Sequence, residues 1–228
     1  MIIDTHCHFD MMPHPEVYIS AKEKVRDMVI GMTNLPSYFR MGQPYLRRYK
    51  FIRLALGLHP LLAAKNICEL SLFSQLVDQT SYIGEIGLDF SKEGFSTKDE
   101  QIFVLRKLLE KLKGKKKIIS VHSRNAEKEL FLLLKEYKIR NVIFHWYSGP
   151  ISLMSDIIEE GYFFSINEAM TLSASGKKII EKIPKDRILT ESDAPFNRRN
   201  DISSALLNIG LDERIIERNF QILMNKIR

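Results

Sequence analysis

The sequence contains little cysteine and no long apolar run. Cys7 and Cys68 are its two cysteines among 228 residues, too few for a disulfide framework, so we predict a reducing, cytoplasmic compartment. No apolar stretch approaches the roughly 20 residues that cross a bilayer. The N-terminus lacks a basic region followed by a long apolar segment, which argues against a secretory signal. We therefore expect no association with a membrane.

The composition that remains is typical of a globular enzyme-sized domain. Hydrophobic residues make up 45% of the chain and charged residues 27%, and the length suits one domain over residues 1–228. No repeat of 20–50 residues is apparent that would indicate a solenoid. The formal net charge of +6 allows a polyanionic partner but does not require one.

Short apolar runs alternate with helical patterns along the whole chain. We predict eight strands, over residues 1–4, 28–32, 51–56, 82–86, 118–121, 142–144, 162–166 and 188–190. We predict helices over 15–26, 38–49, 70–77, 97–113, 125–137, 150–160, 172–183 and 211–227. Eight alternations indicate an α/β fold with a parallel sheet, and favour a closed (β/α)₈ TIM barrel over an open sheet.

The first strand leads into a stretch that combines imidazoles and carboxylates, Asp4-Thr5-His6-Cys7-His8-Phe9-Asp10. Successive side chains on a strand point to opposite faces, so His6 and His8 share one face. Two imidazoles beside carboxylates make half of a metal site. The alternative is a buried strand that merely carries two histidines.

Other polar residues follow later strands at their carboxyl ends, and in a barrel those ends meet at one mouth. They are His59, Glu85, His122, His145 and Asp193. Each alone is as readily a core histidine, a helix cap or an ion-pair partner. Together they would require several independent accidents at one face, so the sequence favours a metal centre.

Six segments resemble the TatD-type metal-dependent nucleases of the amidohydrolase-like barrel superfamily. They are Asp4–Asp10, Gly57-Leu-His-Pro60, Gly84-Glu-Ile-Gly-Leu-Asp89, Val121-His-Ser-Arg124, His145-Trp-Tyr-Ser-Gly149 and Leu189-Thr-Glu-Ser-Asp-Ala-Pro195. Members are typically Mg²⁺- or Mn²⁺-dependent DNases, some of them 3′→5′ exonucleases. Compact relatives also occur in bacterial anti-phage gene clusters, a role with which this chain is compatible.

The resemblance implies two divalent metal ions, with Mg²⁺ or Mn²⁺ preferred and Zn²⁺ also suited to these ligands. The first would be held by His6, His8 and Asp193, and the second by His122 and His145. Glu85 would reach between them, because one shared anion lowers the repulsion between two cations.

A mechanism follows from this ligand set. Asp193 is the candidate general base, although a role as ligand alone is equally compatible. His59 and Arg124 are predicted to contact a substrate phosphate, and a structural ion pair is the alternative for Arg124. Ser148 precedes a predicted helix whose free N–H groups suit an anion. Glu191 shares the strand face of Asp193 and is predicted to orient a metal ligand, with a buried polar residue that has no catalytic part as the alternative.

Basic and aromatic residues carry weaker signals. We expect the lysines of 113–117 to solvate a turn at the end of the barrel opposite the mouth. Arg198 and Arg199 are better placed to meet a nucleic-acid backbone. Trp146, Tyr147 and Phe196 could stack on an unpaired base or simply pack in the core.

Three functions stay open on this basis. The first is a DNase acting on DNA, preferentially on single-stranded 3′ ends. The second is a hydrolase of a small phosphoester, lactone or amide, because fold and ligands alone do not fix the bond that is cleaved. The third is a metal-binding subunit of a multi-protein defence assembly, with protein partners from that cluster.

Overall fold

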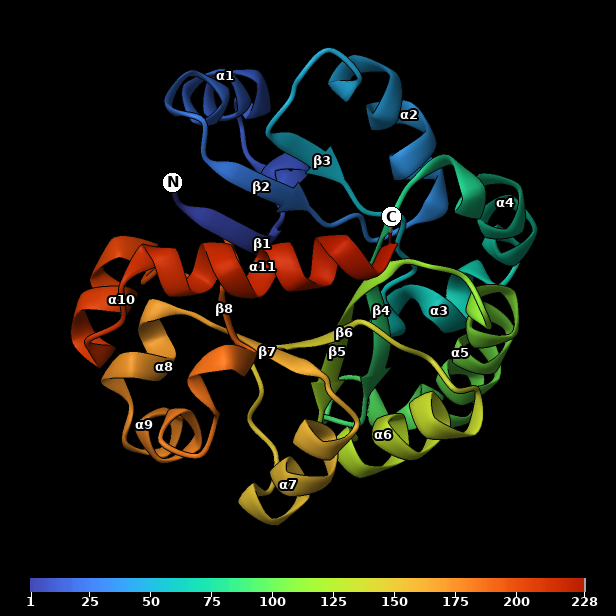
Figure 1. Cartoon of the computed structure of the whole chain (residues 1–228). Coiled ribbons are helices and arrows are strands. Elements are labelled where there is room, and N and C mark those ends of the chain that lie inside the picture. The colour runs from blue at the N-terminus through green and yellow to red at the C-terminus, as the bar shows by residue number, and fades with distance from the viewer. Residues whose placement is uncertain (228) are drawn as a thin grey trace.

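Strands at the centre and helices around them form the molecule (Figure 1). The computed structural model describes residues 1–227. The strands are β1 (Ile3–Cys7), β2 (Met28–Gly31), β3 (Ile52–Leu54), β4 (Tyr82–Asp89), β5 (Ile118–Arg124), β6 (Val142–His145), β7 (Phe163–Ile166) and β8 (Ile188–Thr190). All of the pairings between them are parallel.

The helices are α1 (Pro15–Val25), α2 (Pro36–Leu46), α3 (Pro60–Ala63), α4 (Glu69–Leu76), α5 (Lys98–Leu112), α6 (Glu127–Glu136), α7 (Ile151–Glu159), α8 (Glu168–Leu172), α9 (Ala174–Ile180), α10 (Ile202–Ile209) and α11 (Glu213–Ile227). Short 3₁₀ helices at Phe9–Met11, Ala64–Asn66, Val77–Gln79, Phe95–Thr97 and Lys185–Arg187 lie between them. Within residues 1–227, no helix combines the length and the apolar character needed to span a membrane.

The sheet closes into the predicted barrel. Its ladders run in the orders β1-β2-β3 and β4-β5-β6-β7-β8. Backbone hydrogen bonds join β3 to β4, where the amide of Leu56 donates to the carbonyl of Tyr82 at 3.0 Å. At the other gap, the amide of Asp193 donates to the carbonyl of His6 at 3.0 Å. The expected (β/α)₈ architecture is therefore confirmed.

Several predicted boundaries were wrong. β1 extends to Cys7 rather than ending at residue 4, so the two histidines stand on or just after an ordered strand. The helix predicted over 172–183 is the shorter α9, and Leu172 ends α8 instead, because Ser173 adopts an extended backbone and its hydroxyl accepts the amide of Gly176 as the cap of α9. Helix α10 had not been predicted at all.

Helix α11 lies across the barrel end at which the strands begin (Figure 1). Phe220 and Leu223 of α11 are buried there. The side-chain amide of Asn219, 1% exposed, donates to the carbonyls of Lys185 at 2.7 Å and of Ile188 at 2.8 Å. The helix thus satisfies two backbone acceptors at the start of β8 and leaves the opposite end of the barrel open for a site.

Asn219→Ala should lower the free energy of unfolding by about 2 to 4 kcal/mol, because two carbonyls lose their donor in a buried place. Chemical denaturation measures the change. Asn225→Ala, an exposed substitution on the same helix, should stay within about 0.5 kcal/mol of the wild type. Equal effects of the two substitutions would show that α11 is not anchored through Asn219.

Candidate metal centre

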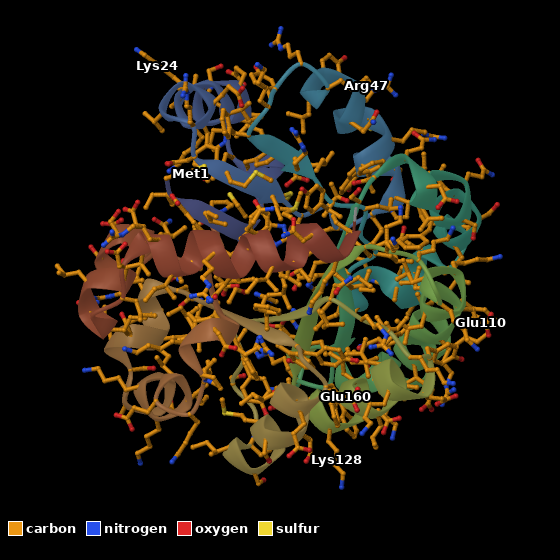
Figure 2. The ribbon with its side chains drawn as sticks, in the orientation of Figure 1. Met1, Lys24, Arg47, Glu110, Lys128 and Glu160 are labelled. Atoms are coloured by element: carbon orange, nitrogen blue, oxygen red, sulfur yellow. The ribbon has the colours of Figure 1, made fainter. Side chains whose placement is uncertain are left out.

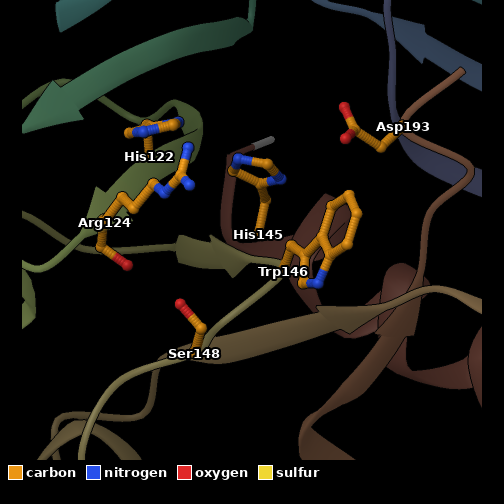
Figure 3. A pocket seen from close by; sticks show the side chains of 7 residues that line it. His122, Arg124, His145, Trp146, Ser148 and Asp193 are labelled. Carbon is orange, nitrogen blue, oxygen red and sulfur yellow. The ribbon is translucent and has the colours of Figure 1, made fainter. Parts of the chain in front are cut away.

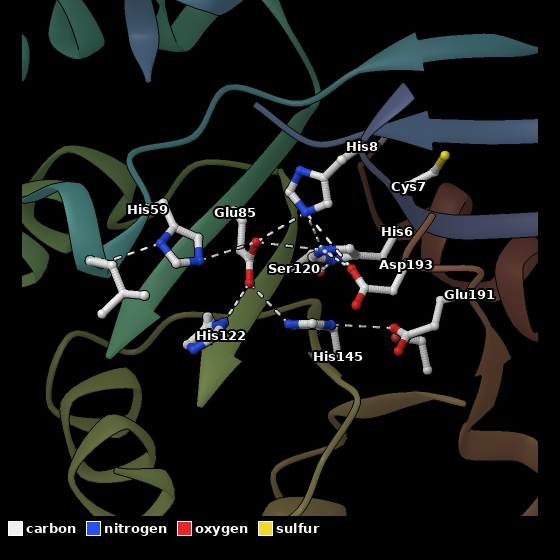
Figure 4. Close-up of polar contacts among 12 residues, drawn as sticks. His6, Cys7, His8, His59, Glu85, Ser120, His122, His145, Glu191 and Asp193 are labelled. Carbon is white, nitrogen blue, oxygen red and sulfur yellow. Dashed lines mark hydrogen bonds and ion pairs between the residues drawn. The ribbon is translucent and has the colours of Figure 1, made fainter. Parts of the chain in front are cut away.

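The polar residues at the strand ends converge on one point inside the barrel mouth (Figure 4). Residues that the sequence places far apart, from His6 on β1 to Asp193 just beyond β8, lie within contact of one another. The six predicted ligands, His6, His8, Glu85, His122, His145 and Asp193, are all brought together with His59. His14 lies apart from them on the surface, with 79% of its side chain exposed.

Glu85 is the centre of this arrangement. Its side chain is 3% exposed and faces five imidazoles. One oxygen, Oε1, is 2.6 Å from Nδ1 of His122 and 2.9 Å from Nε2 of His145. The other, Oε2, is 3.3 Å from Nε2 of His8 and 3.6 Å from Nε2 of His6. The two oxygens therefore face two different pairs of histidines.

The first pair forms a group with Asp193. The Nε2 atoms of His6 and His8 are 3.2 Å apart, and each is 3.9 Å from Oδ1 of Asp193. These three ligand atoms lie within 4.8 Å of one another, close enough to share one ion. The group has the His and carboxylate composition that the sequence predicted.

The remaining histidines group in two ways around Glu85. His145 lies within ligand distance of His6 and Glu85, and His122 within ligand distance of His59 and Glu85. The contacts of His122 and His145 with Oε1 of Glu85 are the shorter ones. The set expected from the resemblance, His122 and His145 with Glu85, is not one of the groups found among the described residues, although each histidine is close to Oε1 of Glu85.

Acidic and hydroxyl side chains contact a second ring nitrogen of three of these imidazoles, the one that does not face Glu85. Asp89 Oδ2 is 2.9 Å from Nε2 of His122, and Ser120 Oγ is 2.8 Å from Nδ1 of His6. Buried Glu191 lies 3.6 Å from Nδ1 of His145. It also accepts hydrogen bonds from Ser165 and Asn167, which fix its position. Asp89 and Ser120 thereby fix which ring nitrogen of His122 and of His6 faces the cluster, while Glu191 is a longer-range charge partner of His145.

The contact with Asp89 had not been predicted, although the sequence holds a signal for it. Glu85, Gly87 and Asp89 alternate along β4, so their inner positions lie on one face. Gly87 has a φ of +148°, and a Cβ there would lie 2.0 Å from the carbonyl oxygen of His122. Only glycine allows β4 and β5 to approach closely enough for both carboxylates to reach His122.

The hydrogen bonds of His59 determine its tautomer. Its Nδ1 accepts the amide of Leu61 at 3.2 Å, at the start of α3. Burial lowers the pKa of His59 to about 4, so its ring is neutral and Nε2 carries the proton. That N–H points toward Oε2 of Glu85, at 3.6 Å. A nitrogen that bears a proton is a donor rather than a metal ligand, which agrees with the expected role of His59 as a contact to substrate.

Burial affects the pKa values of the two acids in this cluster, Glu85 and Asp193, because it destabilises their charged forms. Burial would raise the pKa of Glu85, but the surrounding imidazoles of His59, His145 and His122 outweigh it and hold that pKa well below its usual range. Burial raises the pKa of Asp193 to about 7, because too little positive charge lies near it. A cation beside Asp193 would compensate this carboxylate.

The donor set fits divalent cations. Burial lowers the pKa of His6 well below its ordinary value, which keeps that imidazole neutral, as a ligand must be. The candidate donor atoms of His8 and His145 are their Nε2 nitrogens, which face Glu85, whereas their buried Nδ1 nitrogens have no hydrogen-bond partner among the described residues. Mixed imidazole and carboxylate ligands suit Mn²⁺, Zn²⁺ and Mg²⁺.

A cavity of about 410 Å³ lies over the cluster (Figure 3). His122, His145 and Asp193 of the cluster line it, together with Ser123, Arg124, Trp146 and Ser148. The exposed side chain of Arg124 extends along the wall beside His122, opposite Asp193. Arg124 makes no ion pair with any residue in 1–227. The alternative role predicted for it, a structural ion pair, is therefore wrong.

The chain matches a known protein family over most of its length. The family model described as TatD related DNase matches residues 3–211. The chain belongs to this family. The match extends from the start of β1 to the turn before α11 and so includes every residue of the cluster.

Relatives and solved structures of the TatD family agree with this assignment. An uncharacterized metal-dependent hydrolase of Bacillus subtilis is 30% identical over 212 residues, 86% of this chain and 81% of the relative. The human deoxyribonuclease TATDN3 is 28% identical over 213 residues, 85% of this chain and 78% of its own length. The crystal structure of a TatD homologue from Escherichia coli, YJJV, superposes with a TM-score of 0.84 at 22% identity, over 99% of this chain and 97% of the other.

Metal binding by this TatD family member should be visible as added stability. Mn²⁺ at about 100 times its dissociation constant should raise the free energy of unfolding by about 2.7 kcal/mol relative to protein in EDTA. Thermal unfolding with and without Mn²⁺ measures this. His14→Ala should keep the increase and His6→Ala should lose most of it. An increase of the same size in both variants would place the ion elsewhere.

Proposed function

We propose that this TatD family protein is a deoxyribonuclease that uses two divalent metal ions, Mg²⁺ or Mn²⁺, to hydrolyse phosphodiester bonds. The observation that carries the proposal is the orientation of the Glu85 carboxylate, whose two oxygens face two different pairs of histidines. In this proposal His6, His8 and Asp193 hold one ion with Glu85, and His122 and His145 hold the other. The names of relatives as deoxyribonucleases support DNA as the substrate.

The ions, when bound, supply positive charge that stabilises a phosphorane-like transition state and makes a water acidic near neutral pH. The chain's own groups do the rest. Asp193 accepts the proton that the attacking water loses, since its carboxylate lines the cavity and lies beside His6 and His8. The Nε2–H of His59 donates to a phosphate oxygen or to the leaving group. Asp89 and Glu191 are positioning residues, because they act through His122 and His145.

The size and lining of the cavity over the cluster support a single-stranded end as the substrate. Its volume of about 410 Å³ is in the range of a small-molecule site and suits about one nucleotide. Trp146 lines it, and Phe196, 59% exposed, lies edge-on to His8 with ring centroids 5.0 Å apart. Both rings are available to stack on an unpaired base. Tyr147, in contrast, is buried in the core. We propose 3′→5′ removal of nucleotides from such ends.

Arg124 and Ser148 form the phosphate-binding side of the cavity in this proposal. The Arg124 guanidinium donates two hydrogen bonds to two oxygens of one phosphate. The Ser148 hydroxyl and the first amides of α7 add donors; that helix begins at Ile151, after Pro150 rather than at it. A cytoplasmic location and protein partners from a defence assembly stay predictions.

Asp193→Asn should lower kcat on a 3′-labelled single-stranded oligonucleotide by about 10² to 10⁴-fold, the usual contribution of a general base. Glu85→Gln should remove activity entirely, because both proposed ion sites lose an anionic ligand. EDTA should abolish cleavage by the wild type, and Mg²⁺ or Mn²⁺ should restore it.

His14→Ala is the matched control and should cleave at the wild-type rate. Full activity of Glu85→Gln, or of the wild type in EDTA, would contradict the mechanism. Cleavage of a small phosphoester without any cleavage of DNA would instead favour the small-molecule hydrolase considered from the sequence.

Arg124→Ala should raise KM for the oligonucleotide about tenfold, equivalent to about 1.4 kcal/mol, with a smaller change in kcat. Arg124→Lys should recover part of the loss, since lysine keeps the charge but not the fork. Arg48→Ala, an exposed arginine near α2, is the control. An unchanged KM in Arg124→Ala would remove Arg124 from the substrate site.

A further inference from the structure

A second concave surface lies at the opposite end of the barrel from the metal centre. The loops before β5, β6 and β7 and the end of α11 enclose a cavity of about 470 Å³ there. Gly114 and Gly161 line it with positive φ, and a Cβ on either would meet nothing within 4 Å. The space is therefore open, and its volume is in the range of sites that bind small molecules.

Basic side chains from three separate segments line this cavity. They are Lys115, Lys116, Lys138, Arg140 and Lys226, against one acid, Glu160. Glu160 is already paired with Lys135 at 2.9 Å, and Lys115 with Asp78 at 2.7 Å. The sequence had suggested only that the lysines of 113–117 solvate a turn; the fold adds cations from α11 and from the loop before β6.

Three of these cations lack compensation. Lys138, Arg140 and Lys226 make no ion pair with any residue that the structure describes. Arg187, itself paired with Asp186 at 3.2 Å, lies near Lys226, because Lys226 Nζ and the Arg187 guanidinium are 5.7 and 5.3 Å from the ring centre of the same buried residue, Phe163. Partial desolvation and repulsion from Arg187 and Arg140 lower the pKa of Lys226, whose side chain remains exposed. Bringing these like charges together costs free energy that a bound anion would offset.

We propose that this cavity, defined by Lys138, Arg140 and Lys226, is a second, non-catalytic binding site for a ligand with two or more adjacent phosphates. Such a ligand carries several negative charges on well-separated oxygens, so it can contact all three cations at once and compensate their charge. The phosphates come either from a free nucleotide or from a nucleic-acid strand. The site is independent of the proposed nuclease mechanism.

Calorimetry tests this proposed phosphate site. It measures the binding of ADP, and separately of a short phosphorothioate oligonucleotide, to the full chain in Mg²⁺ buffer. The triple variant Lys138→Ala/Arg140→Ala/Lys226→Ala removes the three charges. The control triple Lys24→Ala/Lys50→Ala/Lys177→Ala lowers net charge equally at exposed lysines elsewhere. Lys24 lies on α1, on the far side of the molecule from Glu160 (Figure 2).

The cavity triple should weaken one class of phosphate-binding sites about tenfold or more, with a reduced dependence on salt, while the control triple keeps it. Loss with ADP alone identifies a free nucleotide as the ligand, and loss with the oligonucleotide identifies a nucleic-acid strand. Equal binding by the two triples for both probes would overturn the proposal. Cleavage by the cavity triple, measured in parallel, should keep the wild-type kcat, so failure of the nuclease mechanism is separable from failure of this site.

Discussion

One buried carboxylate surrounded by imidazoles organises the mouth of this barrel. Glu85 contacts His6, His8, His59, His122 and His145, and each comes from a different strand end except for the first two. An anion so deeply buried is stable only where positive charge or donors surround it. The closed sheet supplies that surrounding, because parallel strands bring their carboxyl ends to one place. The arrangement of the mouth therefore follows from the need to accommodate the charge of Glu85.

Much of this could be predicted from the sequence because the signals are periodic or chemically unusual. Alternation of strands and helices predicted the barrel, and the positions of Glu85, His122 and Asp193 at strand ends predicted their convergence. The family resemblance, confirmed over residues 3–211, carried the assignment to TatD-type proteins. The grouping of His6, His8 and Asp193 in space agrees with the predicted ligand set, although the ions themselves stay a proposal.

Other features depend on distances between segments that a sequence pattern indicates only in part or not at all. The contact of Asp89 with His122 requires the close approach of β4 and β5 at Gly87. The proton position on His59 depends on the amide of Leu61, two residues ahead in a short helix. The break at Ser173 shows a local cap overriding a continuous helical pattern. The basic cavity arises only when α11 folds across the barrel and brings Lys226 near Arg140.

The most direct test of the account is anomalous diffraction from crystals of the wild-type protein grown with Mn²⁺. Two anomalous peaks should appear, one on each side of the Glu85 carboxylate, the first beside His6, His8 and Asp193 and the second beside His122 and His145. Absence of any peak within bonding distance of Glu85, with Mn²⁺ bound elsewhere on the protein, would contradict the account.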